Sequence, residues 1–247
     1  MDLHGKTALV TGGAHRLGKA ITMALARRGC NVAVNYHRSG EAARATVREA
    51  RACGVEAEAW RADVADPDQV EAMVTAVRER FGRLDVLVNG ASLFQRTPFP
   101  TRDLTTWRRV TDILIHGAFH CANAVAPLML EQGAGCIINI TDLSAWQPWP
   151  NFAAHSVGKA ALLALTRQLA LELAPTVRVN AVAPGLILPP PDFTPTQVER
   201  AAARTLLRRW GSPEDVTHAV LYLIEAEYVT GEVLVVDGGE RFGHLRK

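Results

Sequence analysis

The sequence predicts one α/β domain, a three-layer sandwich in which helices cover both faces of a doubly wound, seven-stranded parallel sheet. Two observations lead to this fold class. Short apolar runs alternate with longer segments of helical periodicity, and such alternation gives parallel strands joined by crossover helices. No linker, repeat or low-complexity tract interrupts residues 1–247, and a chain of this length can form one domain with a substantial core.

The elements follow from the pattern in chain order. We expect strands at residues 7–11, 31–36, 56–62, 86–89, 136–141, 177–182 and 233–236. We expect helices at residues 17–28, 41–52, 67–81, 104–131, 152–173, 198–208 and 214–224. Pro67 suits the first turn of its helix, and Gly133 follows the end of the long helix 104–131. The proline-rich loop before residue 198 is either mobile or a rigid connection.

Composition excludes several classes of protein. The net charge of +2 is too small to indicate nucleic acid or an anionic membrane as a partner. The four cysteines form no Cys-x-x-Cys pair, which favours reduced structural thiols, no metal site and a cytoplasmic location. We expect no signal peptide, because the first strand begins at residue 7, and no apolar run that spans a bilayer without polar interruption.

A glycine-rich stretch, Thr11-Gly12-Gly13-Ala14-His15-Arg16-Leu17-Gly18, lies where the first strand turns into the first helix. Glycines let the backbone turn sharply and approach an anion closely, and the N–H groups at the start of a helix face negative charge. Such a turn alone can be a tight connection. Between a strand and a helix it predicts a phosphate site, and hence a Rossmann-type nucleotide-binding fold.

The spacing of this loop resembles the Thr-Gly-x-x-x-Gly-x-Gly loop of short-chain dehydrogenases/reductases. Arg16 stands at the family's middle glycine, and Arg16-Leu17-Gly18 resembles the pteridine reductase branch of that family. The resemblance extends from Lys6 to Gly239. It implies a nicotinamide cofactor, with the Arg16 guanidinium beside the cofactor phosphates.

The end of the second expected strand indicates which cofactor is bound. An acidic residue there usually binds the ribose hydroxyls of NAD, but His37-Arg38-Ser39 contains none. Arg38 can bind a 2′-phosphate, Ser39 adds a donor, and Arg16 can close from the other side. We therefore predict NADPH; the alternative is a solvated loop arginine at position 38.

Further cofactor contacts follow from the resemblance. Asp63-Val64 resembles the family's adenine-contacting pair, although Asp63 could equally begin a helix. Asn89-Gly90-Ala91 resembles the wall beside the adenosine ribose, with Gly90 in place of a second asparagine. Pro184, Gly185 and Ile187 resemble the motif at the nicotinamide carboxamide. The implied cofactor set is Gly12, Arg16, Leu17, Gly18, His37, Arg38, Ser39, Asp63, Val64, Asn89, Ala91, Lys159, Pro184, Gly185 and Ile187.

The expected catalytic residues are Asp142, His155 and Lys159. Their spacing matches the family's Ser … Tyr-x-x-x-Lys signature, with Asp142 for serine, as in pteridine reductases, and His155 for tyrosine. Residues 155 and 159 share a helix face. An unperturbed imidazole titrates at about 6.5, so His155 can donate a proton if Asp142 counters the charge of Lys159. The alternatives are Asp142 alone as proton relay, and lost turnover.

The expected substrate contacts are Ser92, Phe94, Asp142 and Trp146. Phe94 matches the aromatic residue that holds a flat pterin against the nicotinamide in pteridine reductases, because a planar π-face suits a heteroaromatic ring; core packing is the alternative. Leu114 stands where the family has an asparagine that anchors a relay water, and nearby His116 is expected at the surface. Residues 186–204 are expected to form an apolar lid.

These observations favour an NADPH-dependent short-chain reductase that transfers a hydride to a planar pterin- or folate-like or carbonyl small molecule. One alternative is a ketone or 3-oxoacyl reductase of the same family. Another, from a different class, is a catalytically silent NADPH-binding sensor or scaffold, because positions 114 and 155 depart from the family pattern. The resemblance also implies a homotetramer, or a homodimer, built through the long helices and the last strand.

Overall fold

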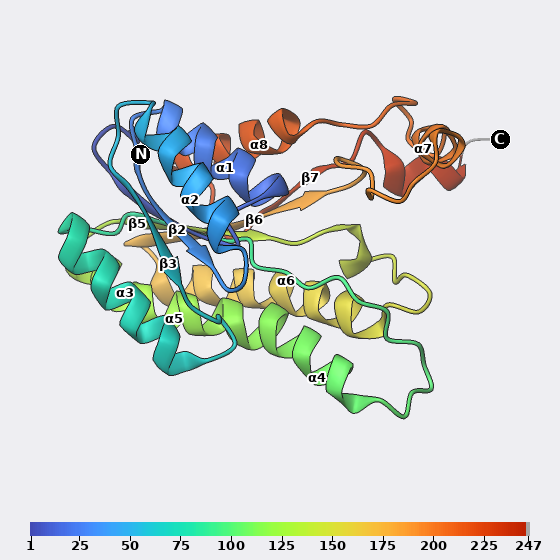
Figure 1. Cartoon of the computed structure of the whole chain (residues 1–247), viewed down its shortest axis with the longest axis horizontal. Helices are drawn as coiled ribbons and strands as arrows, with labels where there is room; N and C mark the ends of the chain where they lie inside the picture. The colour runs from blue at the N-terminus through green and yellow to red at the C-terminus, as the bar shows by residue number, and fades with distance from the viewer. Residues whose placement is uncertain (246–247) are drawn as a thin grey trace.

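The structure is a computed structural model that describes residues 1–245. Its seven strands are β1 (Thr7–Thr11), β2 (Asn31–Tyr36), β3 (Ala57–Arg61), β4 (Val86–Asn89), β5 (Gly135–Ile140), β6 (Val177–Pro184) and β7 (Val233–Val236). They form one parallel sheet in the order β3-β2-β1-β4-β5-β6-β7. The predicted fold class is confirmed: the chain has a Rossmann-like α/β fold with helices on both faces (Figure 1).

The helices are α1 (Arg16–Arg27), α2 (Gly40–Arg51), α3 (Pro67–Phe81), α4 (Leu104–Thr111), α5 (Gly117–Glu131), α6 (Ala153–Leu173), α7 (Pro195–Ala202) and α8 (Pro213–Glu225). Short helical segments occur at Asp112–His116, Leu143–Ala145 and Glu240–Leu245. Helices α1, α2 and α8 cover one face of the sheet, and α3, α5 and α6 cover the other (Figure 1).

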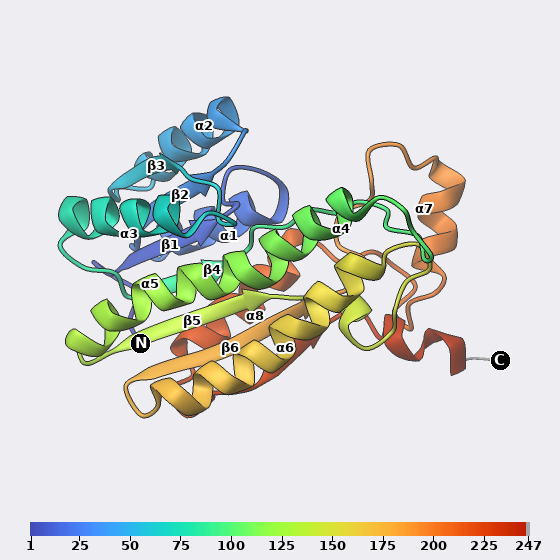
Figure 2. The same ribbon diagram turned by 90° about the horizontal axis from the view of Figure 1, so that it is seen from below.

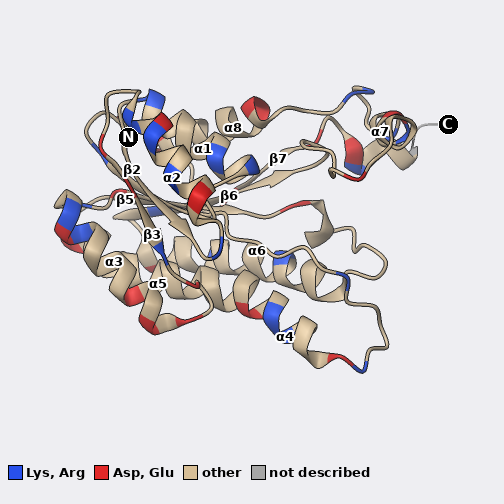
Figure 3. Cartoon of the chain, in the orientation of Figure 1, with Lys and Arg blue, Asp and Glu red and all other residues tan. Residues whose placement is uncertain are grey.

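The core lies in two layers, one on each side of the sheet. Val10 belongs to the layer under α1, α2 and α8, whereas its neighbour Leu9 belongs to the layer under α3, α5 and α6. Successive side chains of a strand point to opposite faces, so a strand covered on both faces is apolar at most positions. This is why the strands were readable in the sequence. Figure 3 shows the charged residues mainly on the outer helices and loops, away from this apolar core.

The expected long helix 104–131 is one continuous rod, formed by α4, a π-helical turn (Asp112–His116) and α5, which runs beside α6 (Figure 2). Within the described chain, this helix is long and apolar enough to cross a membrane by length and composition, but the polar residues His116, His120 and Asn123 interrupt it, as the sequence analysis expected. The core helix of a globular protein meets the same criterion, and 56% of its apolar window is buried in the domain.

The second half of the chain departs most from the predicted bounds. Strand β6 continues to Pro184, two residues beyond the expected end. Helix α7 covers Pro195–Ala202 rather than residues 198–208, because Thr194 and Gln197 form a capping box that starts the helix early. The carboxyl ends of β1 and β4 lie side by side where the strand order reverses, which is where ligands bind in open α/β sheets.

Candidate active site

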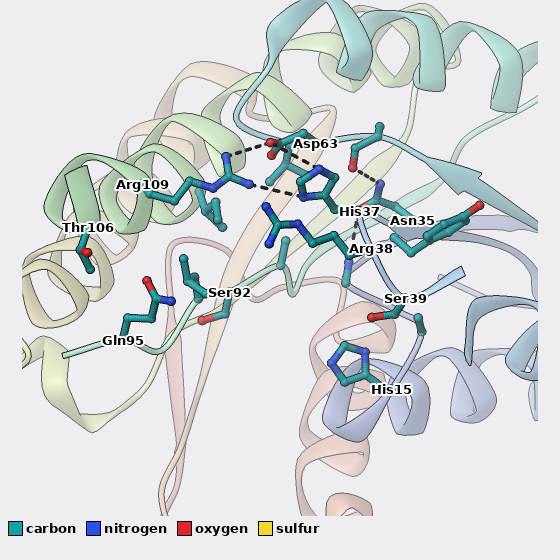
Figure 4. A pocket seen from close by; sticks show the side chains of 18 of the residues that line it. His15, Asn35, His37, Arg38, Ser39, Asp63, Ser92, Gln95, Thr106 and Arg109 are labelled. Carbon is teal, nitrogen blue, oxygen red and sulfur yellow. Dashed lines mark hydrogen bonds and ion pairs between the residues drawn. The ribbon is translucent and has the colours of Figure 1, made fainter. Parts of the chain in front are cut away.

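A cavity of about 510 Å³ opens at this carboxyl edge of the sheet (Figure 4). Seven of the expected cofactor residues line it: Gly12, His37, Arg38, Ser39, Asp63, Val64 and Ala91. The expected substrate residue Ser92 also lines it. Leu17, Gly18, Asn89, Lys159, Pro184, Gly185 and Ile187 are not among its lining residues. The cavity therefore covers only one part of the expected cofactor site, the part that the sequence analysis assigns to the adenosine and its phosphate.

The glycine-rich loop is built for close approach. Gly12 has a φ of +65°, and a Cβ there would lie 3.0 Å from the Cα of Ala91; a Cβ at Gly18 would lie 2.1 Å from the carbonyl oxygen of Gly12. The side chain of His15, the N-cap of α1, makes no capping hydrogen bond, and the first turn of α1 contains no acidic residue. A helix start without these partners fits a phosphate, so the residues present fit a dinucleotide.

The side chain of Arg16 is directed toward the loop after β6. Its Nη2 donates to the carbonyl of Leu188, 3.2 Å away in the loop after β6, and Arg16 does not line the cavity that contains Arg38. Its backbone has a φ of +51°, a left-handed conformation that suits the glycine of the resembled loop. The expected approach of Arg16 to a 2′-phosphate, from the side opposite Arg38, stays a prediction.

Arg38 extends into the cavity from the end of β2, beside Ser39, the N-cap residue of α2 (Figure 4). Asn35, on β2, fixes this corner. Its Oδ1 accepts a hydrogen bond from the backbone N–H of Gly12 at 3.3 Å, and its Nδ2 donates to the carbonyl of Ala62 at 3.1 Å. The loop after β2, which carries Arg38 and Ser39, thus has a fixed position relative to the glycine-rich turn.

Asp63 takes part in a charged cluster across the cavity. Its Oδ2 lies 2.8 Å from Nη1 of Arg109 on α4 and 3.9 Å from Nε2 of His37. Burial acts to raise the pKa of Asp63, but hydrogen bonds from Arg109 and Ala65 outweigh it and hold that pKa below its ordinary value. Helix α3 is capped by Asp66, not Asp63.

Asp142, His155 and Lys159 are brought together at the end of β5 and the start of α6, as their spacing predicted. Asp142 Oδ1 accepts hydrogen bonds from the backbone N–H of Ser144 at 2.9 Å and from its hydroxyl at 2.5 Å. Asp142 Oδ2 lies 2.7 Å from Nε2 of His155. Lys159 is buried, and its ammonium donates to the carbonyl of Ile140 at 2.8 Å.

The charges of this cluster act on one another. Burial acts to raise the pKa of Asp142, but the hydrogen bond from His155 and the charge of Lys159 outweigh it, so the carboxyl pKa is lowered. Burial lowers the pKa of Lys159, and the negative charge of Asp142 opposes that shift. Asp142 is therefore a carboxylate at neutral pH, bonded to His155 and stabilised by the charge of Lys159.

Aromatic rings cover His155. Phe94 contacts the imidazole edge to face at 4.9 Å between ring centroids, and Trp149 stacks on it at 5.9 Å with 12° between the planes. The side chain of His155 is 4% exposed, against 17% for Asp142. Nδ1 of His155 has no hydrogen-bond partner among the described residues. The carboxylate, rather than the imidazole, is thus the more accessible member of the pair.

The remaining expected residues have varied surroundings. Phe94 stacks on Phe152 with ring centroids 4.3 Å apart, yet it stays 56% exposed, and Trp146 is 45% exposed. Asn89 is buried and donates to Oδ1 of Asn139 at 2.9 Å, so its side chain ties β4 to β5. Leu114 is buried in the π-helical turn, whereas His116 is exposed, as expected.

Sequence reasoning missed seven polar residues that line the cavity: His15, Asn35, Tyr36, Gln95, Thr105, Thr106 and Arg109. Arg109 stands four residues before Ile113, which also lines the cavity, so helical spacing alone places the two on one face. That spacing was available in the sequence. What it lacked was the position of α4 relative to Asp63.

Comparisons with known proteins agree with this geometry. A family described as "Enoyl-(Acyl carrier protein) reductase" matches residues 12–240. The chain is 40% identical to a 3-oxoacyl-[acyl-carrier-protein] reductase of Synechocystis sp., over 96% of this chain and 97% of that protein. It is 37% identical to 3beta-hydroxysteroid dehydrogenase 1 of Eggerthella lenta, over 96% and 94%. The structure of FolM alternative dihydrofolate reductase 1 from Brucella canis, complexed with NADP, matches with a TM-score of 0.91 and 33% identity, over 98% and 96%.

Proposed function

The chain belongs to the short-chain dehydrogenase/reductase family of oxidoreductases, and from this premise we propose that it is an NADPH-dependent reductase of a planar pterin- or folate-like small molecule. The observation that carries the proposal is the Asp142–His155 hydrogen bond of 2.7 Å beside the half-exposed ring of Phe94. A carboxylate at this position next to an aromatic platform matches the pteridine reductase pattern.

The choice of NADPH is supported by charge. Residues 36–39 contain no acidic side chain, and Arg38 and Ser39 line the cavity. In the proposal these two residues bind the 2′-phosphate, the start of α1 binds the pyrophosphate, and Lys159 orients the nicotinamide ribose. When bound, NADPH supplies the hydride. The structure of the FolM protein from Brucella canis, complexed with NADP, supports the same choice.

The proton is proposed to come from the Asp142–His155 pair. The imidazole is covered by aromatic rings and bonded to the carboxylate. In the proposed step a doubly protonated His155 gives its Nε2 proton to Oδ2 of Asp142 and becomes the neutral imidazole; Asp142 then gives that proton to a ring nitrogen or carbonyl oxygen of the substrate and returns to the carboxylate. Asp142 is therefore the residue that donates the proton to the substrate, and the more buried His155 supplies that proton to Asp142. Ser144 fixes the second carboxylate oxygen.

Phe94 supports a flat substrate. Its inner face is stacked on Phe152, whereas 56% of the side chain is exposed. A ring held on one side and open on the other can stack on a heteroaromatic system without rearrangement of the pocket.

A second candidate is a ketone or 3-oxoacyl reductase, favoured by the relative from Synechocystis. A third is an NADPH-binding sensor without turnover, favoured by the burial of His155 and by Leu114 at the position of the relay asparagine. For all three we also propose a cytoplasmic homotetramer or homodimer, which light scattering of the purified protein would test.

The deciding experiment follows NADPH absorbance under anaerobic conditions with dihydropterin, dihydrofolate and a 3-oxoacyl thioester. The proposal expects oxidation of NADPH by a pterin or folate with the wild type. No oxidation by either the wild type or His155→Tyr refutes this substrate class. If only the His155→Tyr variant oxidises NADPH, the substrate class stands, and His155 is the reason that the wild type lacks activity. Oxidation by the thioester alone favours the second candidate; fluorescence on cofactor binding without any oxidation favours the third.

A further inference from the structure

Arg109 reaches the cavity from the side opposite the glycine-rich loop. It lies on α4, and its guanidinium bonds with two residues that follow other strands: Oδ2 of Asp63 at 2.8 Å and Nδ1 of His37 at 3.4 Å. Figure 4 shows the guanidinium directed at both, with the side chain of Arg38 in the same cavity. Three elements of the fold therefore meet through one side chain.

The charge of Asp63 explains why this contact matters. The carboxylate is ionised at neutral pH, because Arg109 and Ala65 hold its pKa below the ordinary value. It faces the same cavity in which the cofactor's extra phosphate would meet Arg38, and that phosphate carries a charge of about −1.5 to −2 at neutral pH. An unpaired carboxylate in this partly buried cavity would repel the phosphate.

We propose that Arg109 is a specificity-determining residue, which neutralises Asp63 and positions His37 so that the cavity accepts an adenosine carrying a 2′-phosphate. This inference rests on the proposed use of NADPH. Arg109 would be a second cationic residue, besides Arg38, that favours the 2′-phosphate. It would act indirectly, through its ion pair with Asp63. The side chain of Arg109 is only 32% exposed, so water and salt weaken the Arg109–Asp63 interaction only in part. The charge of Arg109 therefore acts on Asp63 inside the cavity.

The test measures binding of two fragments, 2′,5′-ADP and 5′-AMP, by isothermal titration calorimetry, which requires no turnover. Arg109→Met is expected to weaken 2′,5′-ADP about tenfold, because the charge of Asp63 is left unpaired. Binding of 5′-AMP should change by less than about twofold, because it lacks the 2′-phosphate. Arg109→Lys keeps the charge and should keep the preference. Arg108→Met, an exposed neighbour on the same helix, is the matched control and should bind both fragments as the wild type does.

The double variant Asp63→Asn/Arg109→Met separates charge from scaffolding. If Arg109 acts by neutralising Asp63, removal of both charges restores 2′,5′-ADP binding to within about twofold of the wild type. If Arg109 only ties α4 to the sheet, the double variant binds as poorly as Arg109→Met, and the assignment is overturned. Equal weakening of both fragments by Arg109→Met would overturn it as well.

The two proposals fail in different ways. A wild type that binds 5′-AMP as tightly as 2′,5′-ADP contradicts the proposed use of NADPH itself. A wild type that prefers 2′,5′-ADP, with an Arg109→Met variant that keeps the same preference, contradicts only the role given to Arg109.

Discussion

The two ends of the proposed cofactor site differ in what defines them. At the proposed adenosine end, an open cavity of about 510 Å³ is lined by charged side chains such as those of Arg38, Asp63 and Arg109, and a Cβ at Gly12 would meet the main chain of Ala91. At the catalytic end, the site is defined by side chains, with His155 bonded to Asp142 and covered by Trp149. The open end thus presents charged groups to a ligand, whereas at the covered end the buried imidazole leaves the carboxylate of Asp142 as the more accessible group.

The largest effect should come from the catalytic end. Asp142→Asn removes the carboxylate that carries the proton and leaves the buried His155 without its acceptor. We expect turnover to fall about 10²- to 10⁴-fold, the usual range for a lost general acid, with the Kd for NADPH almost unchanged. Steady-state kinetics and cofactor titration measure the two quantities. Asp68→Asn, an exposed aspartate on α3, is the control; unchanged turnover in Asp142→Asn would exclude the proposed donor.

At the adenosine end, Arg38→Met should alter binding rather than chemistry. A hydrogen bond to a charged group contributes about 1.5–3 kcal/mol, so the Kd for NADPH should rise about ten- to hundredfold while that for NADH stays constant. Arg48→Met, exposed on α2, serves as the comparison. A parallel loss of both cofactors would mean that Arg38 does not read the 2′-phosphate.

Trp149→Ala should uncover the imidazole of His155 at the catalytic end of the site. It removes the ring that stacks on His155, and such aromatic pairs contribute about 0.5–1.5 kcal/mol, so the free energy of unfolding in urea should drop by about that amount. The uncovered imidazole should also react faster with diethyl pyrocarbonate, as peptide mapping would reveal. An unchanged reaction rate at His155 would show that Trp149 does not shield it.

The smallest effect concerns pH. The folded-state pKa of Asp142 lies below its ordinary value of 3.8, so its ionisation stabilises the fold fully above that value. The contribution is lost as the pH falls through the lower, folded-state pKa. Urea unfolding of the wild type and Asp142→Asn between pH 3 and pH 6 should therefore give a stability difference that shrinks at the acidic end. A difference that grows on acidification would contradict the lowered pKa.

The sequence was most informative where local rules decide the structure. The bounds of β1, β2, β4, β7 and α3 match the expected ones, because these strands are short, largely apolar runs and Pro67 marks a helix start. The proposed catalytic residues Asp142 and His155 were expected to lie together and do so, and helical spacing brings Lys159 to the same face as His155.

Contacts between distant segments could not be derived in this way. The partner of Arg16 is Leu188, 172 positions away in a proline-rich loop, so its direction depends on tertiary packing. Arg109 was missed because its partner Asp63 becomes a neighbour only once α4 packs beside the sheet. The cover on His155 likewise depends on where the loop that carries Trp149 lies.

The account depends above all on the recognition of a 2′-phosphate at the open end of the site. Equilibrium titration of the wild type with NADPH and with NADH, followed by nicotinamide fluorescence, tests this directly. We predict a Kd for NADPH at least about tenfold below that for NADH, in line with charge-assisted hydrogen bonds to the phosphate. Equal affinities, or tighter binding of NADH, would contradict the account.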